Sequence, residues 1–301
     1  IAGVGGVGGV AILLVVLRNK RKRQGSNNAS ARALNALETK CRRMIDSVQM
    51  KLKILVAFCQ IAGSFRSTFS IPFPASYTAF MSSLSGVVDF DLPAMFRLNC
   101  AVSLSYDVAI LLKTSGSLLI FLALGIGISI SAVVIRKVHN NAGDMLTRWC
   151  TSSILSLSFL IYPGISLSLF RWFKCVPAGP DTHVLLADMR VFCNTASYWS
   201  FTAYVVGMIA VFPFGIPAAY FGLVFRYRMR IQSKSRNTDK RIQSFRFLWG
   251  AYEPRFWYWE VVELMRKLVL AGVMVVVIEG STLQIAIGLL VCFVAGIAYA
   301  L

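Results

Sequence analysis

Seven apolar segments, each close to the length that a helix needs to cross a bilayer, dominate the sequence. They run over residues 1–17, 54–70, 115–135, 150–170, 197–225, 260–278 and 282–301. A membrane-spanning helix takes about 20 mainly apolar residues, because the hydrocarbon core of a bilayer is about 30 Å thick. The pattern predicts an all-α integral membrane protein, a bundle of about seven transmembrane helices. Both chain ends lie inside apolar runs, so we expect a fragment of a longer protein.

The composition excludes most soluble classes of protein. Charged residues make up 15 % of the chain, against about 25 % in an average soluble domain. Lys and Arg nevertheless number 31 against 13 acidic residues, which gives a net charge of +18. A disordered chain would be less hydrophobic, and a soluble nucleic-acid-binding domain would be richer in charge. We therefore expect a membrane protein with no nucleic-acid partner.

The basic residues are sorted between the segments that connect the predicted spans. If residue 1 lies outside, the inside segments 18–53, 136–149 and 226–267 hold 25 Lys and Arg and seven acidic residues. The rest of the chain holds six of each. Because Lys and Arg concentrate in cytoplasmic loops, this asymmetry predicts the direction of the chain through the bilayer. We expect a plasma membrane, of the cell surface or of a flagellum, with an anionic inner leaflet.

Three parts of the chain follow from this topology. Residues 1–23 are predicted to form the first transmembrane helix and a basic stop-transfer segment, residues 24–53 a cytoplasmic linker, and residues 54–301 a six-span domain. Within the linker, apolar residues from Leu34 to Leu52 recur at spacings of three and four, which predicts an amphipathic helix on the inner membrane surface. An ordinary cytoplasmic helix packed on other loops and a short coiled coil are the alternatives.

Two groups of side chains next to the predicted spans are expected to contact lipid. Each basic residue at a membrane surface contributes about 1 kcal/mol of attraction to anionic headgroups, and aromatic residues gather at the boundary between lipid and water. The predicted lipid-binding residues are Arg18, Lys20, Arg21, Lys22, Arg23, Arg226, Arg228 and Arg230. The predicted interfacial aromatic belt is Trp249, Tyr252, Phe256, Trp257, Tyr258 and Trp259.

Two outer loops carry candidate sites. In the loop 171–196, Cys175 and Cys193 face the oxidising side, and we predict a disulfide between them. Closing a loop of that size contributes about 3 kcal/mol. In the loop 71–114, Asp89 and Asp91 could attract cations to the mouth of a pore. The alternative is that these two aspartates only turn the loop toward water.

The predicted sixth span begins with four charged residues, and two other spans hold three prolines between them. Glu260, Glu263, Arg266 and Lys267 either form structural pairs, with Glu263 and Lys267 four residues apart, or take part in gating. Kinks are expected at Pro163, Pro213 and Pro217.

No sequence pattern of a catalytic or cofactor-binding site is present. The chain has neither a zinc-protease nor a phosphate-loop nor a nucleophile-elbow motif, and its two histidines lie far apart in the sequence. We expect no enzyme activity, no metal site and no cofactor. Asp188, in the same outer loop as the two cysteines, is expected to have a turn or capping role.

Several stretches together resemble one family. They are Lys51–Leu55 with Phe58–Ile61, Ile71–Pro74, Cys175 with Leu185–Asp188 and Cys193, Phe212–Pro217, and Phe247–Glu260 with Glu263–Lys267. This set resembles the multi-spanning membrane domain of large algal and stramenopile surface proteins. That domain is similar to transient-receptor-potential channels and is related to polycystin-like and flavin-carrier channels. The stretch Tyr252–Glu260 is the most specific part.

The resemblance implies a cation channel, and a role in sensing mechanical force and in passing calcium is expected from it. It also implies an extracellular region or filament attached before Ile1, and it leaves open a homo-oligomer. One departure concerns the pore: only Glu279, Gly280 and Ser281 join the last two predicted spans, which is too short for a re-entrant pore loop. Either the pore helices are expected beyond Leu301, or this domain does not conduct ions. The alternative function is a membrane anchor that does not conduct.

Overall fold

The computed structural model describes residues 44, 48, 51–63, 74–80, 105–138, 140–239, 241–274 and 282–300. The chain divides into two compact units, residues 1–57 and 58–301. In the first unit the described residues are helical, and the apolar side chains of Met44, Val48 and Leu52 are exposed. The predicted first span and most of the predicted amphipathic helix lie outside the described residues.

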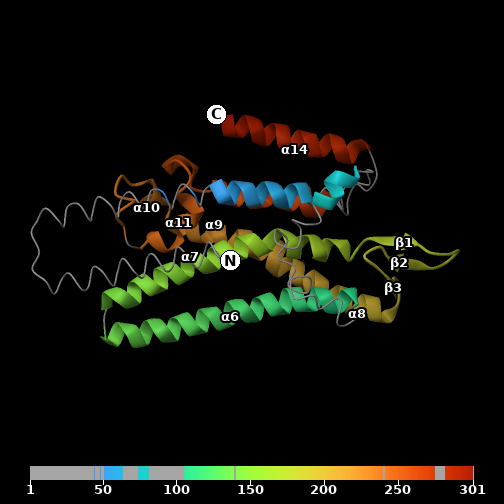
Figure 1. The fold of residues 1–301 in the computed structure, drawn as a ribbon, viewed down its shortest axis with the longest axis horizontal. Coiled ribbons are helices and arrows are strands. Elements are labelled where there is room, and N and C mark those ends of the chain that lie inside the picture. Colours follow the sequence, from blue (N-terminus) through green and yellow to red (C-terminus); the bar gives the residue numbers. More distant parts are fainter. Residues whose placement is uncertain are drawn as a thin grey trace, which may run out of the picture. The chain divides into compact units, whose positions relative to one another are not determined.

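The second unit contains two long helices that pack against each other, α6 (Tyr106–Val138) and α7 (Asn140–Arg171) (Figure 1). Helix α6 begins well before residue 115, where the sequence predicted its span to start. Two charged residues, Asp107 and Lys113, led the sequence prediction to place the start too late, and both have favourable positions in the structure. Asp107 lies in the first turn, where a negative charge is favourable, and the Nζ atom of Lys113 donates to Ser168 Oγ of α7 at 3.4 Å.

A small antiparallel sheet follows α7. The prediction of an all-α protein is therefore wrong in this part of the chain. Its strands are β1 (Cys175–Pro177), β2 (His183–Leu185) and β3 (Asp188–Phe192), in the order β1-β2-β3. Register pairs Cys175 with Leu185 and Val184 with Phe192. Strands of three to five residues are too short to show a period-two pattern in the sequence.

One apolar stretch then folds into α8 (Ala196–Ile209), the π-helical segment η1 (Ala210–Gly215) and α9 (Ile216–Arg226). Thr195 caps the stretch, because its Oγ1 accepts the backbone N–H of Tyr198 at 3.2 Å. The irregularity expected at Pro213 takes the form of η1, which contains this proline. A proline removes a backbone donor, and a π-turn is one way in which a helix continues around it.

Short helical turns fill the segment between α9 and the next long element. They are α10 (Arg228–Gln232), η2 (Gln243–Phe245), α11 (Arg246–Trp249) and η3 (Pro254–Phe256). Helix α12 (Trp259–Leu268) continues into a second π-helical segment, η4 (Val269–Val273). The last described helix is α14 (Thr282–Ala300), in which the Gln284 side chain donates to the Met274 carbonyl at 2.9 Å.

Four helical stretches are long and apolar enough to cross a membrane, within the part of the chain that is described. They are Tyr106–Ser131, Cys150–Arg171, Ala196–Arg226 and Thr282–Tyr299. Seven spans are therefore not supported. The predicted span 1–17 lies outside the described residues, as does the end of the predicted span 54–70. The predicted span 260–278 is described only as far as residue 274. In this described part, the ten residues of α12 carry four charged side chains.

Two hydrophobic cores lie on two faces of α7. The loop core consists of Phe159, Tyr162, Tyr220, Val224, Ile231, Ile242, Phe245, Leu248, Trp249, Leu264 and Leu268. The sheet core consists of Ile110, Ile161, Ile165, Leu169, Trp172, Leu185, Cys193, Tyr198, Val205 and Phe212. Helix α7 contributes to both, and 56 % of its apolar window is buried, against 11 % for α14. Helix α7 is thus the central helix of the second unit.

Candidate functional site

The charged residues of α12 form the most unusual polar cluster among the described residues. Positions 260, 264, 267 and 268 are all buried, and residues at these spacings share one face of a helix. Two of the four, Glu260 and Lys267, are ionisable, and each is 1 % exposed. The face that packs against the loop core therefore carries one acidic and one basic side chain.

The two buried charges have different partners. The Tyr252 hydroxyl donates to Glu260 Oε2 at 3.1 Å. The Lys267 Nζ atom lies 3.7 Å from the centre of the Phe159 ring on α7, and Phe247 meets the same ring edge-on with a centroid distance of 5.4 Å. A cation over an aromatic face contributes about 2 kcal/mol when water is excluded. This contact therefore ties α12 to α7.

The other two charges of the cluster pair with each other. Arg266 Nε and Nη2 donate to the two oxygens of Glu263, at 3.1 and 2.8 Å. The sequence had suggested Glu263 and Lys267 as the pair. The structure joins Glu263 to Arg266 instead, because Lys267 points into the loop core and Arg266 does not. Tyr299 of α14 also hydrogen bonds to Glu263, so the cluster joins α12 to α14 as well.

A second polar element consists of hydroxyl groups that link α7 to its neighbours. Ser158 Oγ lies 2.7 Å from the Tyr220 hydroxyl of α9. The Tyr162 hydroxyl donates to the Pro213 carbonyl at 3.2 Å, a carbonyl that loses its usual helical partner because Pro217 has no N–H. Trp172 Nε1 donates to Thr202 Oγ1 of α8 at 2.9 Å. Two of these bonds join α7, and the third joins the residue directly after α7, to different segments of the stretch Ala196–Arg226.

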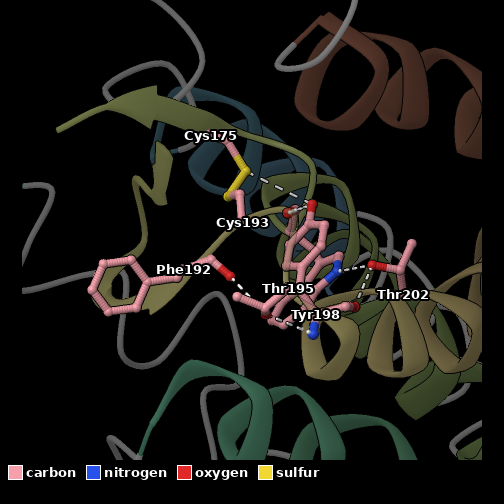
Figure 2. Close-up of a disulfide and its surroundings, with 7 residues drawn as sticks. Cys175, Phe192, Cys193, Thr195, Tyr198 and Thr202 are labelled. Carbon is pink, nitrogen blue, oxygen red and sulfur yellow. Dashed lines mark hydrogen bonds between the residues drawn. A yellow bond between two sulfur atoms is a disulfide. The ribbon is translucent and has the colours of Figure 1, made fainter. Parts of the chain in front are cut away.

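The predicted disulfide is confirmed. Cys175 and Cys193 are bonded across 18 positions, with their Cα atoms 6.5 Å apart (Figure 2). Beside the bond, the Trp172 and Tyr198 rings stack with centroids 5.0 Å apart, and the Tyr198 hydroxyl donates to the Trp172 carbonyl at 3.1 Å. The disulfide therefore fastens the sheet to the start of α8. Cys59, Cys150 and Cys292 are free thiols.

Asp188 has the capping role that the sequence suggested. Its Oδ2 accepts the backbone N–H of Tyr106, the first residue of α6, at 3.1 Å, and its Oδ1 accepts from Arg190 Nε at 2.8 Å. The hydrogen bond from the Arg190 side chain is the main reason why the pKa of Asp188 lies below its ordinary value. One carboxylate thus joins the sheet to α6.

The predicted lipid-binding residues fall into two sets. Arg18, Lys20, Arg21, Lys22 and Arg23 lie outside the described residues, as do Asp89 and Asp91. Arg226 is exposed at the end of α9, and the guanidinium of Arg228 lies 4.1 Å from the Phe225 ring centre. Arg230 instead pairs with Asp239 at 3.2 Å.

The predicted aromatic belt is divided between the interior and the surface. Trp249 is 1 % exposed and belongs to the loop core, so it does not contact lipid. Its Nε1 donates to the Ile242 carbonyl at 3.2 Å. Tyr258 is exposed, whereas Tyr252, Phe256, Trp257 and Trp259 are half-buried. The spacing of aromatic residues alone could not separate these environments, because the segment has no regular helical or strand period.

Sequence reasoning missed the partners of the α12 charges. Phe159 is more than 100 positions away from Lys267 in the chain, and no local pattern connects the two residues. A signal did exist for Tyr162, since Pro213 and Pro217 are four residues apart. That spacing leaves one helical carbonyl in need of a side-chain donor.

Comparisons with protein-family models, with curated proteins and with solved structures find no match to this chain. Within the described residues, the fold is mostly helical, with four helices long and apolar enough to cross a membrane, two hydrophobic cores and one disulfide. The resemblance to transient-receptor-potential-like domains therefore stays a prediction.

Proposed function

We propose that the chain is the membrane domain of a channel-like protein that passes cations, and that the charges of α12 couple its loop core to α7. The observation that carries the proposal is the burial of Glu260 and Lys267 next to long apolar helices. Ionisable side chains inside membrane bundles are costly, and they usually mark ion pathways, relays or sensors.

Buried hydroxyl groups support the same proposal. Thr114, Ser117, Ser158, Ser166, Ser168 and Thr202 are all buried. Several of them bond back to their own helix, as Ser166 does to the Tyr162 carbonyl at 2.7 Å. Oxygen atoms of this kind can replace part of the hydration shell of a cation. Small shifts between α7 and its neighbours would present these oxygens to a path between the helices.

The cluster is suited to coupling because it reaches three separate elements. Lys267 contacts α7 through Phe159, Glu260 contacts the segment before η3 through Tyr252, and Glu263 contacts α14 through Tyr299. The π-helical segment η4 follows directly after these residues, and π-turns within helices frequently lie at functional sites. Movement of the basic segment 227–258 would therefore reach α7 and α14 together.

Liposome flux measurements on the full-length protein test the proposal. Wild-type protein should pass monovalent or divalent cations, and Glu260→Gln and Lys267→Met should lower the flux roughly five- to 150-fold, the range of ordinary coupling free energies. Glu253→Gln is the matched control, since Glu253 is 64 % exposed and pairs with Arg255, and it should leave the flux unchanged. All variants must first elute as single species with the melting temperature of the wild type.

Two outcomes would overturn the proposal in different ways. A wild-type protein that passes no cation would remove the channel function. Normal flux in both cluster variants would leave a channel but would remove the coupling role of α12.

The alternative is a non-conducting membrane anchor for an extracellular region or filament. The observation that favours it is the disulfide-closed sheet, which is fastened to α6 by Asp188 and to α8 by Cys193. Such a fastened outer end is suited to bearing load. Absence of flux, together with loss of filament binding after reduction of the disulfide, would favour the anchor.

A further inference from the structure

An aromatic patch lies where the stretch Ala196–Arg226 ends. Phe221 and Phe225, one turn apart on α9, stack with ring centroids 5.6 Å apart. Trp257 lies 6.0 and 6.1 Å from these two rings. Phe221 is 44 % and Phe225 45 % exposed, so the patch combines close aromatic packing with an open outer surface.

Two arginines border the aromatic patch. Arg226 is the last residue of the candidate span and is exposed. Arg228 lies over Phe225, with its Cζ atom 4.1 Å from the ring centre, and its Nη1 donates to the Phe225 carbonyl at 3.3 Å. This arrangement holds the guanidinium of Arg228 at the edge of the patch.

The carboxylates of this region are used by other arginines. Asp239 pairs with Arg230 at 3.2 Å, and Glu253 pairs with Arg255 at 3.0 Å. Within the described residues, neither Arg226 nor Arg228 forms an ion pair. Their two positive charges are therefore available to an anion from outside the chain.

An exposed apolar stripe leads to these arginines along η1 and α9. Val211, Phe214, Ala218, Phe221 and Phe225 are all exposed, at spacings of three, four, three and four that keep them on one helix face. From Val211 to Phe225 the stripe is about 20 Å long at 1.5 Å per residue. An apolar stripe of this length that ends in two cations matches a lipid molecule, whose acyl chain leads to a charged headgroup.

We propose that Phe221, Phe225 and Trp257, together with Arg226 and Arg228, bind an anionic phospholipid of the surrounding bilayer. The acyl chain lies along the exposed stripe, the aromatic rings lie at the glycerol level, and the two guanidiniums hold the phosphate. Arginine suits this role because its planar fork can donate two parallel hydrogen bonds to phosphate oxygens. Among these rings, that of Trp257 favours the boundary between lipid and water because a tryptophan ring is amphipathic.

The proposal goes beyond the proposed function and holds whether or not the chain passes cations. It requires only that the stretch Ala196–Arg226 crosses the bilayer. It also narrows the set of lipid-binding arginines that the sequence suggested at this end of the protein, because Arg230 is occupied by Asp239.

Native mass spectrometry of the full-length protein, titrated with phosphatidylserine and separately with phosphatidylcholine, tests the site. The double variant Arg226→Gln and Arg228→Gln should weaken phosphatidylserine binding about fivefold per arginine, about 25-fold in total. The matched control is the double variant Arg230→Gln and Arg255→Gln, which removes the same charge from two paired arginines and should weaken binding less than twofold. Phosphatidylcholine binding should be equal in all three proteins.

An equal loss of phosphatidylserine binding in the control variant would overturn the site, because it would show attraction by net charge alone. Unchanged binding in the Arg226 and Arg228 variant would overturn it as well.

A second measurement tests the aromatic part of the site. Phosphatidylserine with bromine atoms near the headgroup should quench tryptophan fluorescence in the wild type, and Trp257→Phe should remove most of this quenching. This conservative change keeps a ring in the patch, so folding is expected to be preserved. Quenching that is the same in Trp257→Phe and in wild type would show that the lipid does not lie against Trp257.

Discussion

The two cores on α7 are built by different means. The sheet core is closed by a disulfide. The loop core has no disulfide among the described residues, and it packs against the buried charges of α12 through Phe159. The comparison teaches that one helix can join a covalently fixed region to one that is held by packing and electrostatics. The second region is the one that can rearrange without breaking a bond.

Among the changes considered, removal of the disulfide should lower the unfolding free energy the most. The double variant Cys175→Ser and Cys193→Ser should lose about 3 kcal/mol of unfolding free energy, because the unfolded chain regains the freedom of the closed loop. The measurement is thermal unfolding in detergent with and without a reducing agent. Wild-type protein should respond to the reducing agent, and the variant should not.

The same experiment can contradict the contrast between the cores. A reducing agent that exposes Trp249 in the loop core as much as Trp172 in the sheet core would show that the two cores unfold as one. Site-specific fluorescence, in variants that keep only one of these tryptophans, distinguishes the two outcomes.

Removing the Tyr162 hydroxyl, which links α7 to η1, should lower the stability by an intermediate amount. Tyr162 is 0 % exposed, and Tyr162→Phe leaves the Pro213 carbonyl without its side-chain donor. An unsatisfied buried acceptor costs about 1–3 kcal/mol, so the melting temperature should fall accordingly.

Tyr204→Phe provides the control for Tyr162. The hydroxyl of Tyr204 lies 2.7 Å from Thr114 Oγ1 and 2.8 Å from Ser115 Oγ. Thr114 also donates to the Ile110 carbonyl at 2.8 Å and keeps that bond in the variant, and Ser115 is half-buried rather than buried. The loss should therefore be smaller than for Tyr162→Phe. Equal losses would contradict the assignment of a special role to the Pro213 carbonyl.

The smallest loss of stability is expected from removal of Asp188, which links the sheet to α6. Asp188→Ala should cost about 1 kcal/mol at neutral pH, because it removes the acceptor for the first backbone N–H of α6. The pKa of Asp188 is lowered in the folded protein, mainly by its hydrogen bond from Arg190. The stabilisation by the ionised Asp188 is therefore fully present above the ordinary aspartate pKa of about 4. It is lost as the pH falls through the lower pKa that Asp188 has in the folded protein.

Chemical unfolding of wild-type and Asp188→Ala protein over a pH series checks this prediction. The difference in unfolding free energy between the two proteins should become smaller only at acidic pH. Asp181→Ala, in the exposed turn between β1 and β2, should show little loss at any pH. A gap at Asp188 that stays constant down to strongly acidic pH would contradict the role of its charge.

The sequence predicted those features that depend on local composition. The apolar runs 150–170 and 197–225 correspond closely to Cys150–Arg171 and Ala196–Arg226, and the cysteine pair was found from its spacing and expected environment. The start of α6 was misplaced because Lys113 reads as a loop residue until its contact with Ser168 is known.

Features that depend on distant contacts could not be predicted. Lys267 could be recognised as a charge within an apolar region, but its position over Phe159 depends on how α12 packs on α7. The sequence places Trp249 among several interfacial aromatic residues, and only the tertiary fold shows that it is buried. Pattern alone gives the type of side chain at a position, whereas packing decides whether it meets lipid, water or core.

The sharing of α7 between two cores limits how the chain can vary in length. Leu155, Phe159 and Tyr162 face one core, and Ile161, Ile165 and Leu169 face the other. Inserting or deleting a single residue between these positions would rotate the rest of the helix by about 100°, which would turn one set of side chains away from its partners. Length changes should therefore be tolerated in the turn after β1 but not within the middle of α7.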